Sequence, residues 1–406
     1  MKKTLAAVAV LGAFAGSALA ADVQLYGIVD TGVRYMHSDF DVRNDVGYND
    51  GSYDATDSFS MESGMASGSR WGLKGTEELG NGLTVGFVLE DGFTSDNGAE
   101  KGVMFDRESS LFLQGGFGKF AMGRIGSING GVSSWAKHGV MSAFGTSWQG
   151  YSANADNIFG NAGQWDNMIA YETPDFAGFK VFAQYGMGSN DNENESSSDR
   201  YYAIGASYAN GPLNLFLSVD STNYKSWDSA SKKASDPDDA WTVRFGGNYD
   251  FEVVKIFAGF SYFDNAKLSN YSGVLTDRIK YQLNGDNVNY PTDADVTAAL
   301  SKMQMQGWSL GVSASVPVAG GQVLAGVGYL DAEASDSVAP LYAGAWKDAE
   351  MSRWIVSVGY DYPFSKRTDV YAVATFNQDS VEFNNAKMND EDPSAYGVMI
   401  GLRHKF

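Results

Sequence analysis

Hydrophobic and polar residues alternate one by one in many short segments of this chain. Between Pro212 and Asp220 the odd-numbered positions are apolar and the even-numbered positions are mostly polar, with Phe216 as the exception. An alternation of period two indicates a β-strand with one apolar face. The same pattern recurs in segments 83–89, 179–185, 254–260, 323–329 and 398–402. The chain is therefore predicted to be rich in strands.

Two kinds of connection alternate between these strands. Short turns, most of them with the Gly or Pro that tight turns require, are predicted at 78–82, 115–118, 174–178, 210–212, 250–252, 317–321 and 363–366. Long polar connections are predicted at 37–64, 93–103, 126–163, 188–199, 223–239, 265–304, 331–349 and 379–394. Seven turns and eight loops make fifteen connections, so the pattern predicts sixteen strands.

The first twenty residues differ from this pattern. MKKTLAAVAVLGAFAGSALA has two lysines, an apolar run and small residues at its end, which is typical of a secretory signal peptide cleaved after Ala20. Beyond it, no apolar run approaches the ~18–20 residues of a transmembrane helix. Residues 1–20 are therefore predicted to be removed on export, and a membrane role of residues 21–406 would require strands.

The charge and the cysteine content exclude one class of partner and one source of stability. The formal net charge is −20, from 29 basic and 49 acidic residues. Nucleic acid binds to cationic surfaces, so no nucleic-acid partner is expected. The chain has no cysteine, so packing and hydrogen bonds must stabilise it without disulfides.

Short turns at one end, long loops at the other and an export signal are the pattern of an outer-membrane β-barrel. A bilayer offers no water to the backbone, so a spanning sheet must close on itself. The predicted fold is all-β, a 16-stranded antiparallel transmembrane β-barrel, in which segment 395–406 pairs with segment 23–34. Tandem β-sandwich domains also alternate, but no linker interrupts this chain and its polar face is too rich in glycine for a soluble core.

Five motifs, in sequence order, resemble those of the trimeric general diffusion porins of Gram-negative bacteria, most closely the beta-proteobacterial type. They are VQLYGIVDTGV (23–33), SGSRWGLKGTEELGNGL (67–83), FDRESSLFLQGGFGKFAMGR (105–124), FSKRTDVYA (364–372) and GLRHKF (401–406). The resemblance implies an outer-membrane, water-filled channel through which small hydrophilic solutes and ions diffuse passively. It also implies a homotrimer without cofactors, and a third loop, about 126–163, that folds into the lumen and constricts it. Phe406 would belong to the signal that the barrel-insertion machinery reads.

Basic residues on one wall are the candidates for the constriction. Alternation turns Arg34, Arg70 and Lys74 toward the lumen, and the resemblance implies that Arg70 and Arg124 occupy arginine positions of the family. Arg124 shares the parity of Phe120 and Met122, so strict alternation points it at lipid. A bulge or the exit from the strand would be needed to turn it inward.

The predicted lumen loop carries few acids to oppose these bases. Its candidate site residues are Trp135, Lys137, Trp148, Tyr151 and Asp156. Related porins usually place acids here, whereas this loop has chiefly Asp156, with Asp166 at its exit. The aromatic rings, which include Phe144, have two readings that the sequence leaves open: contact with the faces of sugars, or packing of the loop against the wall.

No catalytic or metal site is predicted. The only histidines are His37, His138 and His404, and none belongs to a known nucleophile motif. A pair of His138 with Ser133 or Ser142 is the alternative that the sequence leaves open. Acids crowd several long loops, where clustered carboxylates suit hard cations, but their spacing matches no calcium-loop motif. Solvated loops bridged to lipopolysaccharide by divalent ions are the favoured interpretation.

The function predicted from the sequence is therefore an outer-membrane porin, not an enzyme, with a weak preference for anions. Charges at the constriction are less screened by salt than loops more than a Debye length away, ~8 Å at physiological ionic strength. The first alternative is a substrate-selective channel for sugars or other nutrients, which saturable flux would reveal. The second is a surface adhesin or receptor barrel that acts through its acidic loops.

Overall fold

The computed structural model describes residues 22–39, 56–130, 132–188, 198–224, 227–228, 233–234, 238–271, 304–335, 349–383 and 392–406. The predicted signal peptide and most of the acidic loop stretches lie outside these ranges. No helix within the described ranges is long and apolar enough to cross a membrane.

One antiparallel sheet accounts for nearly all of the regular structure. Its strands are β1 (Gln24–Asp39), β2 (Thr56–Ser63), β3 (Arg70–Gly80), β4 (Leu83–Gly92), β5 (Glu108–Gly115), β6 (Gly118–Gly126), β7 (Gln164–Glu172), β8 (Phe179–Gly186), β9 (Arg200–Asn210), β10 (Leu213–Asn223), β13 (Ala240–Asp250), β14 (Lys255–Lys267), β15 (Gln304–Val318), β16 (Gly321–Ala334), β17 (Ala349–Pro363), β18 (Thr368–Phe383) and β19 (Ser394–Lys405). The two-residue strands β11 (Trp227–Asp228) and β12 (Lys233–Ala234) pair only with each other.

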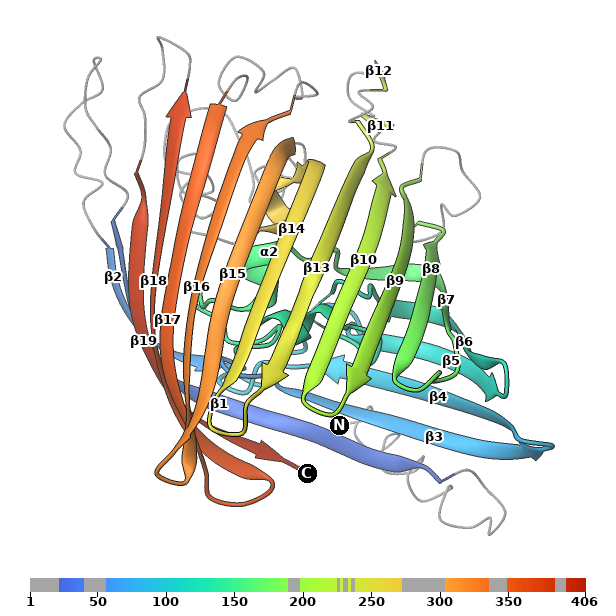
Figure 1. Cartoon of the computed structure of the whole chain (residues 1–406). Helices are drawn as coiled ribbons and strands as arrows, with labels where there is room; N and C mark the ends of the chain where they lie inside the picture. The colour runs from blue at the N-terminus through green and yellow to red at the C-terminus, as the bar shows by residue number, and fades with distance from the viewer. Residues whose placement is uncertain are drawn as a thin grey trace.

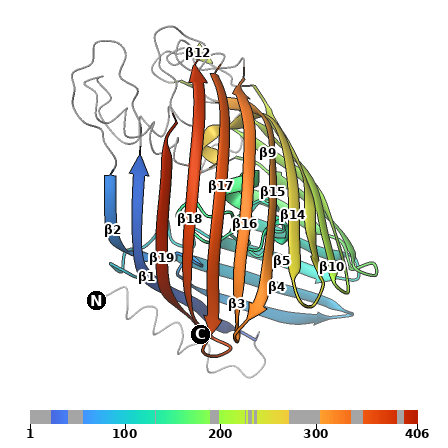
Figure 2. The same ribbon diagram turned by 60° about the vertical axis from the view of Figure 1, so that its left-hand side comes forward.

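The sheet closes into a barrel of sixteen strands. It contains seventeen assigned strands, but β2 and β3 pair with successive parts of β1 and so form one barrel strand that is interrupted at residues 64–69. Counted in this way, each barrel strand pairs with the barrel strands before and after it in the chain, and β1 pairs with β19. This confirms the predicted sixteen-stranded antiparallel barrel. Figures 1 and 2 show the strands around a common interior that holds the green segment with α2 (Ala155–Phe159).

The first strand is longer than predicted, and this corrects the predicted loop 37–64. Residues 35–38 continue β1 because they pair with β19 on one side and with β2 on the other. Residues 56–63 are therefore strand, although they are rich in Ser and acidic residues. Residues 35–38 have pairing partners on both sides and residues 56–63 pair with β1, so backbone hydrogen bonds hold both segments in the sheet, which the local sequence pattern does not reveal.

The last residue completes the closure. Beyond β19 the backbone of Phe406 exchanges two hydrogen bonds with Gly27, each 3.1 Å between nitrogen and oxygen. The ring of Phe406 covers Gly27, where an added Cβ would lie 2.4 Å from Phe406 Cζ and 2.6 Å from the carbonyl oxygen of Arg70. Only a residue without a side chain fits at this seam.

Gly27→Ala is therefore expected to destabilise the barrel by about 1–3 kcal/mol, because the new methyl group displaces the terminal ring and the backbone of β3. The temperature at which purified barrel loses its compact mobility on a detergent gel measures this effect. Gly116→Ala is the matched control, since no atom lies within 4 Å of the Cβ position there. Equal unfolding temperatures for Gly27→Ala and the wild type would contradict the expected clash.

Rings line the outer face near the long-loop end of the barrel. Ring centroids are 5.3 Å apart for Trp241 and Tyr262, 5.5 Å for Trp308 and Tyr329, and 4.6 Å for Tyr329 and Trp354. Amphipathic rings of this kind occupy the interface between membrane and water. Apolar residues such as Leu217 and Ile256 are exposed on the same outer face, as expected for a surface that contacts lipid.

Candidate functional site

The segment between β6 and β7, described at residues 127–130 and 132–163, lies inside the barrel and is the lumen loop of this structure. It contains the 3-10 turn η1 (His138–Met141) and α2. Six polar wall side chains on β8, β13, β15, β17 and β18 each hydrogen-bond one of its backbone groups. The pairs are Gln184 with Ile128 N, Asn248 with Val140 O, Ser313 with Ala143 N, Thr375 with Tyr151 O, Ser357 with Ala153 N and Arg244 with Phe159 O, with paired atoms 2.7–2.9 Å apart.

Arg244 links the lumen loop to a buried ion pair. Its guanidinium pairs with Asp220 and donates through Nε to the carbonyl of Phe159, which ends α2. Asn129, near the start of the loop, donates to Asp220 Oδ1 at 2.6 Å. Both charged side chains are buried, and buried charges need partners to offset their lost hydration. The Arg244–Asp220 pair on the wall thus holds the lumen loop near its start, at Asn129, and near its end, at Phe159.

Glycines on the wall create the hollow in which α2 packs. A Cβ on Gly259 would lie 2.6 Å from Phe159 Cζ, and one on Gly328 would lie 2.5 Å from Ile158 Cγ1. Phe159 and Ile158 are buried in the main apolar cluster together with the wall residues Phe216 and Leu324. The small wall residues are therefore shaped to the loop that covers them.

The large aromatic side chains of the loop mostly pack inside. Trp135, Phe144 and Trp148 are buried, and Trp148 makes edge-to-face contacts with Phe144 and with Tyr371 of β18, at 5.9 and 5.2 Å between ring centroids. Trp148 and Tyr151 nevertheless contribute atoms to the cavity wall. Of the two interpretations open from the sequence, this geometry favours packing for Trp135, Phe144 and Trp148.

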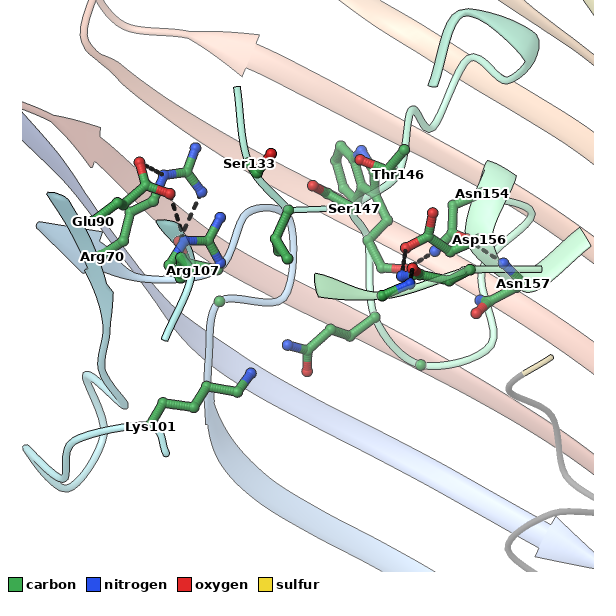
Figure 3. A pocket seen from close by; sticks show the side chains of 18 of the residues that line it. Arg70, Glu90, Lys101, Arg107, Ser133, Thr146, Ser147, Asn154, Asp156 and Asn157 are labelled. Carbon is green, nitrogen blue, oxygen red and sulfur yellow. Dashed lines mark hydrogen bonds and ion pairs between the residues drawn. The ribbon is translucent and has the colours of Figure 1, made fainter. Parts of the chain in front are cut away.

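A cavity of about 1140 Å³ lies between the lumen loop and the wall built from β1–β5. Its charged lining consists of the bases Arg34, Arg70, Lys74, Lys101 and Arg107 and the acids Glu90, Glu108 and Asp156. Figure 3 shows Arg70, Glu90 and Arg107 on one side of the cavity and Asp156 on the other. The wall is predominantly basic, and the loop side is nearly neutral.

Arg70 and Arg107 share one carboxylate. Arg107 Nε lies 2.7 Å from Glu90 Oε1, and Arg70 Nε lies 3.5 Å from Glu90 Oε2. Tyr26 donates to Glu90 Oε2 at 2.9 Å, and Arg70 Nη1 donates to the carbonyl of Gly68 at 3.0 Å. Two guanidinium groups are thus fixed by one acid, which leaves an excess positive charge at the cavity wall.

Arg34 and Lys74 line the same cavity, as alternation placed them. Arg34 Nη2 pairs with Glu62 Oε1 at 2.6 Å, so part of its charge is compensated. Lys74 Nζ lies 5.1 Å from the ring centroid of Tyr26, a cation–π contact that leaves the ammonium group available to solvent. The structure brings three of the four predicted wall residues to one place.

Arg124 does not line this cavity. The register of β6 and β7 shifts between Gly123 and Ile125, so the irregularity anticipated at this position is present. The guanidinium of Arg124 pairs with Asp166 and donates to the carbonyl of Asp106 at 2.7 Å. These contacts hold it at the outer end of β6, beside the exit of the lumen loop.

The two charged residues predicted in the loop are both partnered. Asp156 accepts from Asn161 Nδ2 at 2.7 Å and lies 2.7 Å from the buried His138 Nε2. Lys137 Nζ lies 3.9 Å from Glu172 Oε2 on β7. Burial lowers the pKa of Lys137, while the nearby Glu172 carboxylate opposes that shift.

Sequence reasoning missed Arg107, Glu90 and Lys101. Arg107 and Lys101 precede β5 in a connection, where period-two parity carries no information. Arg107 falls inside the motif FDRESS at 105–110, which was the one available signal. Glu90 shares the inward parity of Val88 on β4, but its role depends on which strands lie beside it.

No arrangement for catalysis or metal binding is found in the described residues. The hydroxyls of Ser133 and Ser142 bond to backbone groups of Trp135 and Ala153, not to His138. Within the described ranges, no three His, Asp or Glu side chains converge closely enough to hold a metal ion.

Comparison with known proteins adds independent information. The sequence model described as Gram-negative porin matches residues 6–381. An outer membrane porin protein of Bordetella pertussis is 34% identical over the full length of both chains.

Among solved structures, the anion-selective porin from Comamonas acidovorans superposes with a TM-score of 0.64 at 24% identity, over 95% of this chain and 100% of that one. OmpT of Vibrio cholerae, in its trimer form, gives a TM-score of 0.58 at 18% identity, over 95% and 100%. At these identities the two likenesses support the barrel fold alone.

Proposed function

The chain belongs to the family of Gram-negative porins, and on that premise we propose that its channel passes small hydrophilic solutes with a preference for anions. The protein is an outer-membrane porin by family and fold. It is not an enzyme, as the sequence predicted, since the family consists of channels.

The excess of basic groups around the cavity supports the anion preference. Five cationic side chains and three carboxylates line it, so the formal local charge is +2 although the whole chain carries −20. A narrow, low-dielectric wall concentrates the field of its own charges on a passing ion. Acids on loops more than a Debye length away, ~8 Å, are largely screened.

The lumen loop is proposed to form the constriction together with Arg34, Arg70, Lys74 and Arg107. Solutes cross hydrated, so no polar group has to be stripped of water at a cost of several kcal/mol. Selectivity then depends on the width of the gap and the sign of its charges.

Assembly and partners form the second part of the proposal. We expect three barrels side by side, a state in which the fold relative OmpT is described. The Comamonas relative, described as anion-selective, shares the fold. Phe406, fixed against Gly27, is proposed to serve also as the signal for the barrel-insertion machinery, and the outer loops are proposed to contact lipopolysaccharide.

Single-channel recording in a planar bilayer, with a potassium chloride gradient across it, tests the proposal. Conductance steps in groups of three and a zero-current potential on the chloride side are the expected result. A potential on the potassium side would overturn the anion preference. Solute flux that saturates with concentration would instead favour a substrate-selective channel.

A further inference from the structure

A second group of cationic side chains lies inside the barrel, at the end where the short turns are. Lys119 is on β6 next to the turn before Gly118, and it pairs in register with Glu172 of β7. Lys180 projects from β8, and Lys137 reaches down from the lumen loop. The short turns of such barrels face the periplasm, so these three lysines lie on the periplasmic side of the loop.

The three ammonium groups have fewer carboxylate partners than charges, because two of them share one acid. The carboxylate of Glu172 forms ion pairs with both lysines, at 2.6 Å from Lys180 Nζ to Oε1 and 3.9 Å from Lys137 Nζ to Oε2. Lys119 Nζ lies over the rings of Phe112 and Trp135, at 4.3 and 5.0 Å from their centroids. Within the described residues, Lys119 makes no ion pair at 4.0 Å or less.

Glu108, the other acid in this region, is already occupied. Its Oε2 accepts from the backbone of Ser134 at 2.8 Å, and its Oε1 accepts from the hydroxyls of Ser134 and Ser110 at 3.1 and 2.8 Å. These three neutral donors satisfy the hydrogen bonds of the carboxylate but do not cancel its charge, so the three lysines together with Glu172 and Glu108 carry a formal charge of +1. The lysine cluster keeps a positive excess.

The cluster continues directly from the basic cavity. Ser134 lines the cavity, and Lys137 Nζ donates to the Ser134 carbonyl at 3.4 Å. Lys180 and Lys137 keep 34% and 27% of their side chains exposed on this inward-facing surface. Lys119, Lys137 and Lys180 do not line that cavity themselves, but they lie beside it, so an anion moving from the Arg70–Arg107 wall toward the short turns would come next to these ammonium groups.

We propose that Lys119, Lys137 and Lys180 form a binding station for small multivalent anions, of the class of inorganic phosphate, at the periplasmic exit of the channel. This inference rests on the proposed anion preference of the same pore. Ammonium groups act as point charges that each donate to a phosphate oxygen. Two or more of them close together favour a divalent over a monovalent anion, because the attraction scales with the charge of the ion.

Block of chloride current by inorganic phosphate tests the station. Phosphate is added to one side of a bilayer containing the full-length trimer, and then to the other, with potassium chloride on both. In the wild type, we expect block at a lower phosphate concentration when phosphate is added on the side that faces the short turns, because the three lysines lie at that end. The variant Lys119→Gln/Lys180→Gln should require roughly tenfold more phosphate on that side, the ratio that corresponds to the loss of one to two screened charge contacts.

Lys366→Gln is the control matched to the single variant Lys180→Gln, since Lys366 is exposed on the short turn between β17 and β18 and the change removes one positive charge outside the lumen. Lys180→Gln alone provides a second variant that leaves Lys119 against Trp135, in case the double change disturbs packing. Its block should weaken in the same direction.

The outcomes separate this inference from the function on which it rests. A wild-type channel that prefers chloride, with unchanged phosphate block in the lysine variants, overturns the station and leaves the proposed function standing. A wild-type channel that prefers potassium overturns both. An equal loss of block in Lys366→Gln would assign the effect to surface charge and also reject the station.

Discussion

Arg70→Gln/Arg107→Gln is expected to move the zero-current potential of the channel from the chloride side to the potassium side of a salt gradient. The change leaves three bases and three acids around the cavity. It also removes both guanidinium groups from Glu90, which then stands beside the Tyr26 hydroxyl as an uncompensated carboxylate. An unpaired acid at the narrow wall attracts cations and repels anions.

Arg367→Gln is the control matched to each single substitution, because it removes one guanidinium charge from an exposed short turn outside the cavity. Each single substitution, Arg70→Gln or Arg107→Gln, should give an intermediate potential, since the remaining guanidinium still neutralises Glu90. The shift should shrink as the salt concentration rises. An unchanged potential in the double variant would show that the ion preference is set elsewhere.

Arg244→Met should lower the free energy of unfolding by about 3–5 kcal/mol, the usual cost of leaving one member of a buried ion pair alone. Among the described residues, Asp220 would then keep only the hydrogen bond from the neutral amide of Asn129. The carbonyl of Phe159 would also lose its donor, so the lumen loop should loosen. We expect a lower gel unfolding temperature together with noisier open-channel current.

Arg244→Met/Asp220→Asn separates the two effects. The neutral amide of Asn removes the buried negative charge, so most of the stability should return, while Phe159 still lacks its hydrogen bond. Recovered stability with persistent current noise is the expected result. Quiet current in both variants would mean that the other wall contacts suffice to hold the loop.

Most of the barrel was predictable because its strands and turns depend on residues that are close together in the sequence. In segment 212–220, side chains alternate between lipid and lumen, so every second residue is apolar, and the turn at 210–212 needs Gly and Pro. Segment 56–63 was not predicted as strand, since its pairing with β1 depends on a contact between residues that the alternation does not link.

The candidate site was predictable only where it lies on regular strands. Parity placed Arg34, Arg70 and Lys74 at the cavity. It could not place Arg107, which lies in a connection before β5, or decide the direction of Arg124, where the register shifts. The packing of Trp148 against Tyr371 was equally hidden, because it joins a loop to a strand more than two hundred residues later.

The anchors of the lumen loop have a consequence for how such a channel diverges over evolutionary time. Wall side chains such as Ser313, Ser357 and Thr375 bond the backbone of the loop and not its side chains. A mutation that exchanges a loop side chain leaves those bonds in place. Side chains of the loop can therefore change without breaking the bonds that hold its backbone to the wall, so the lining of the cavity can vary on a constant scaffold.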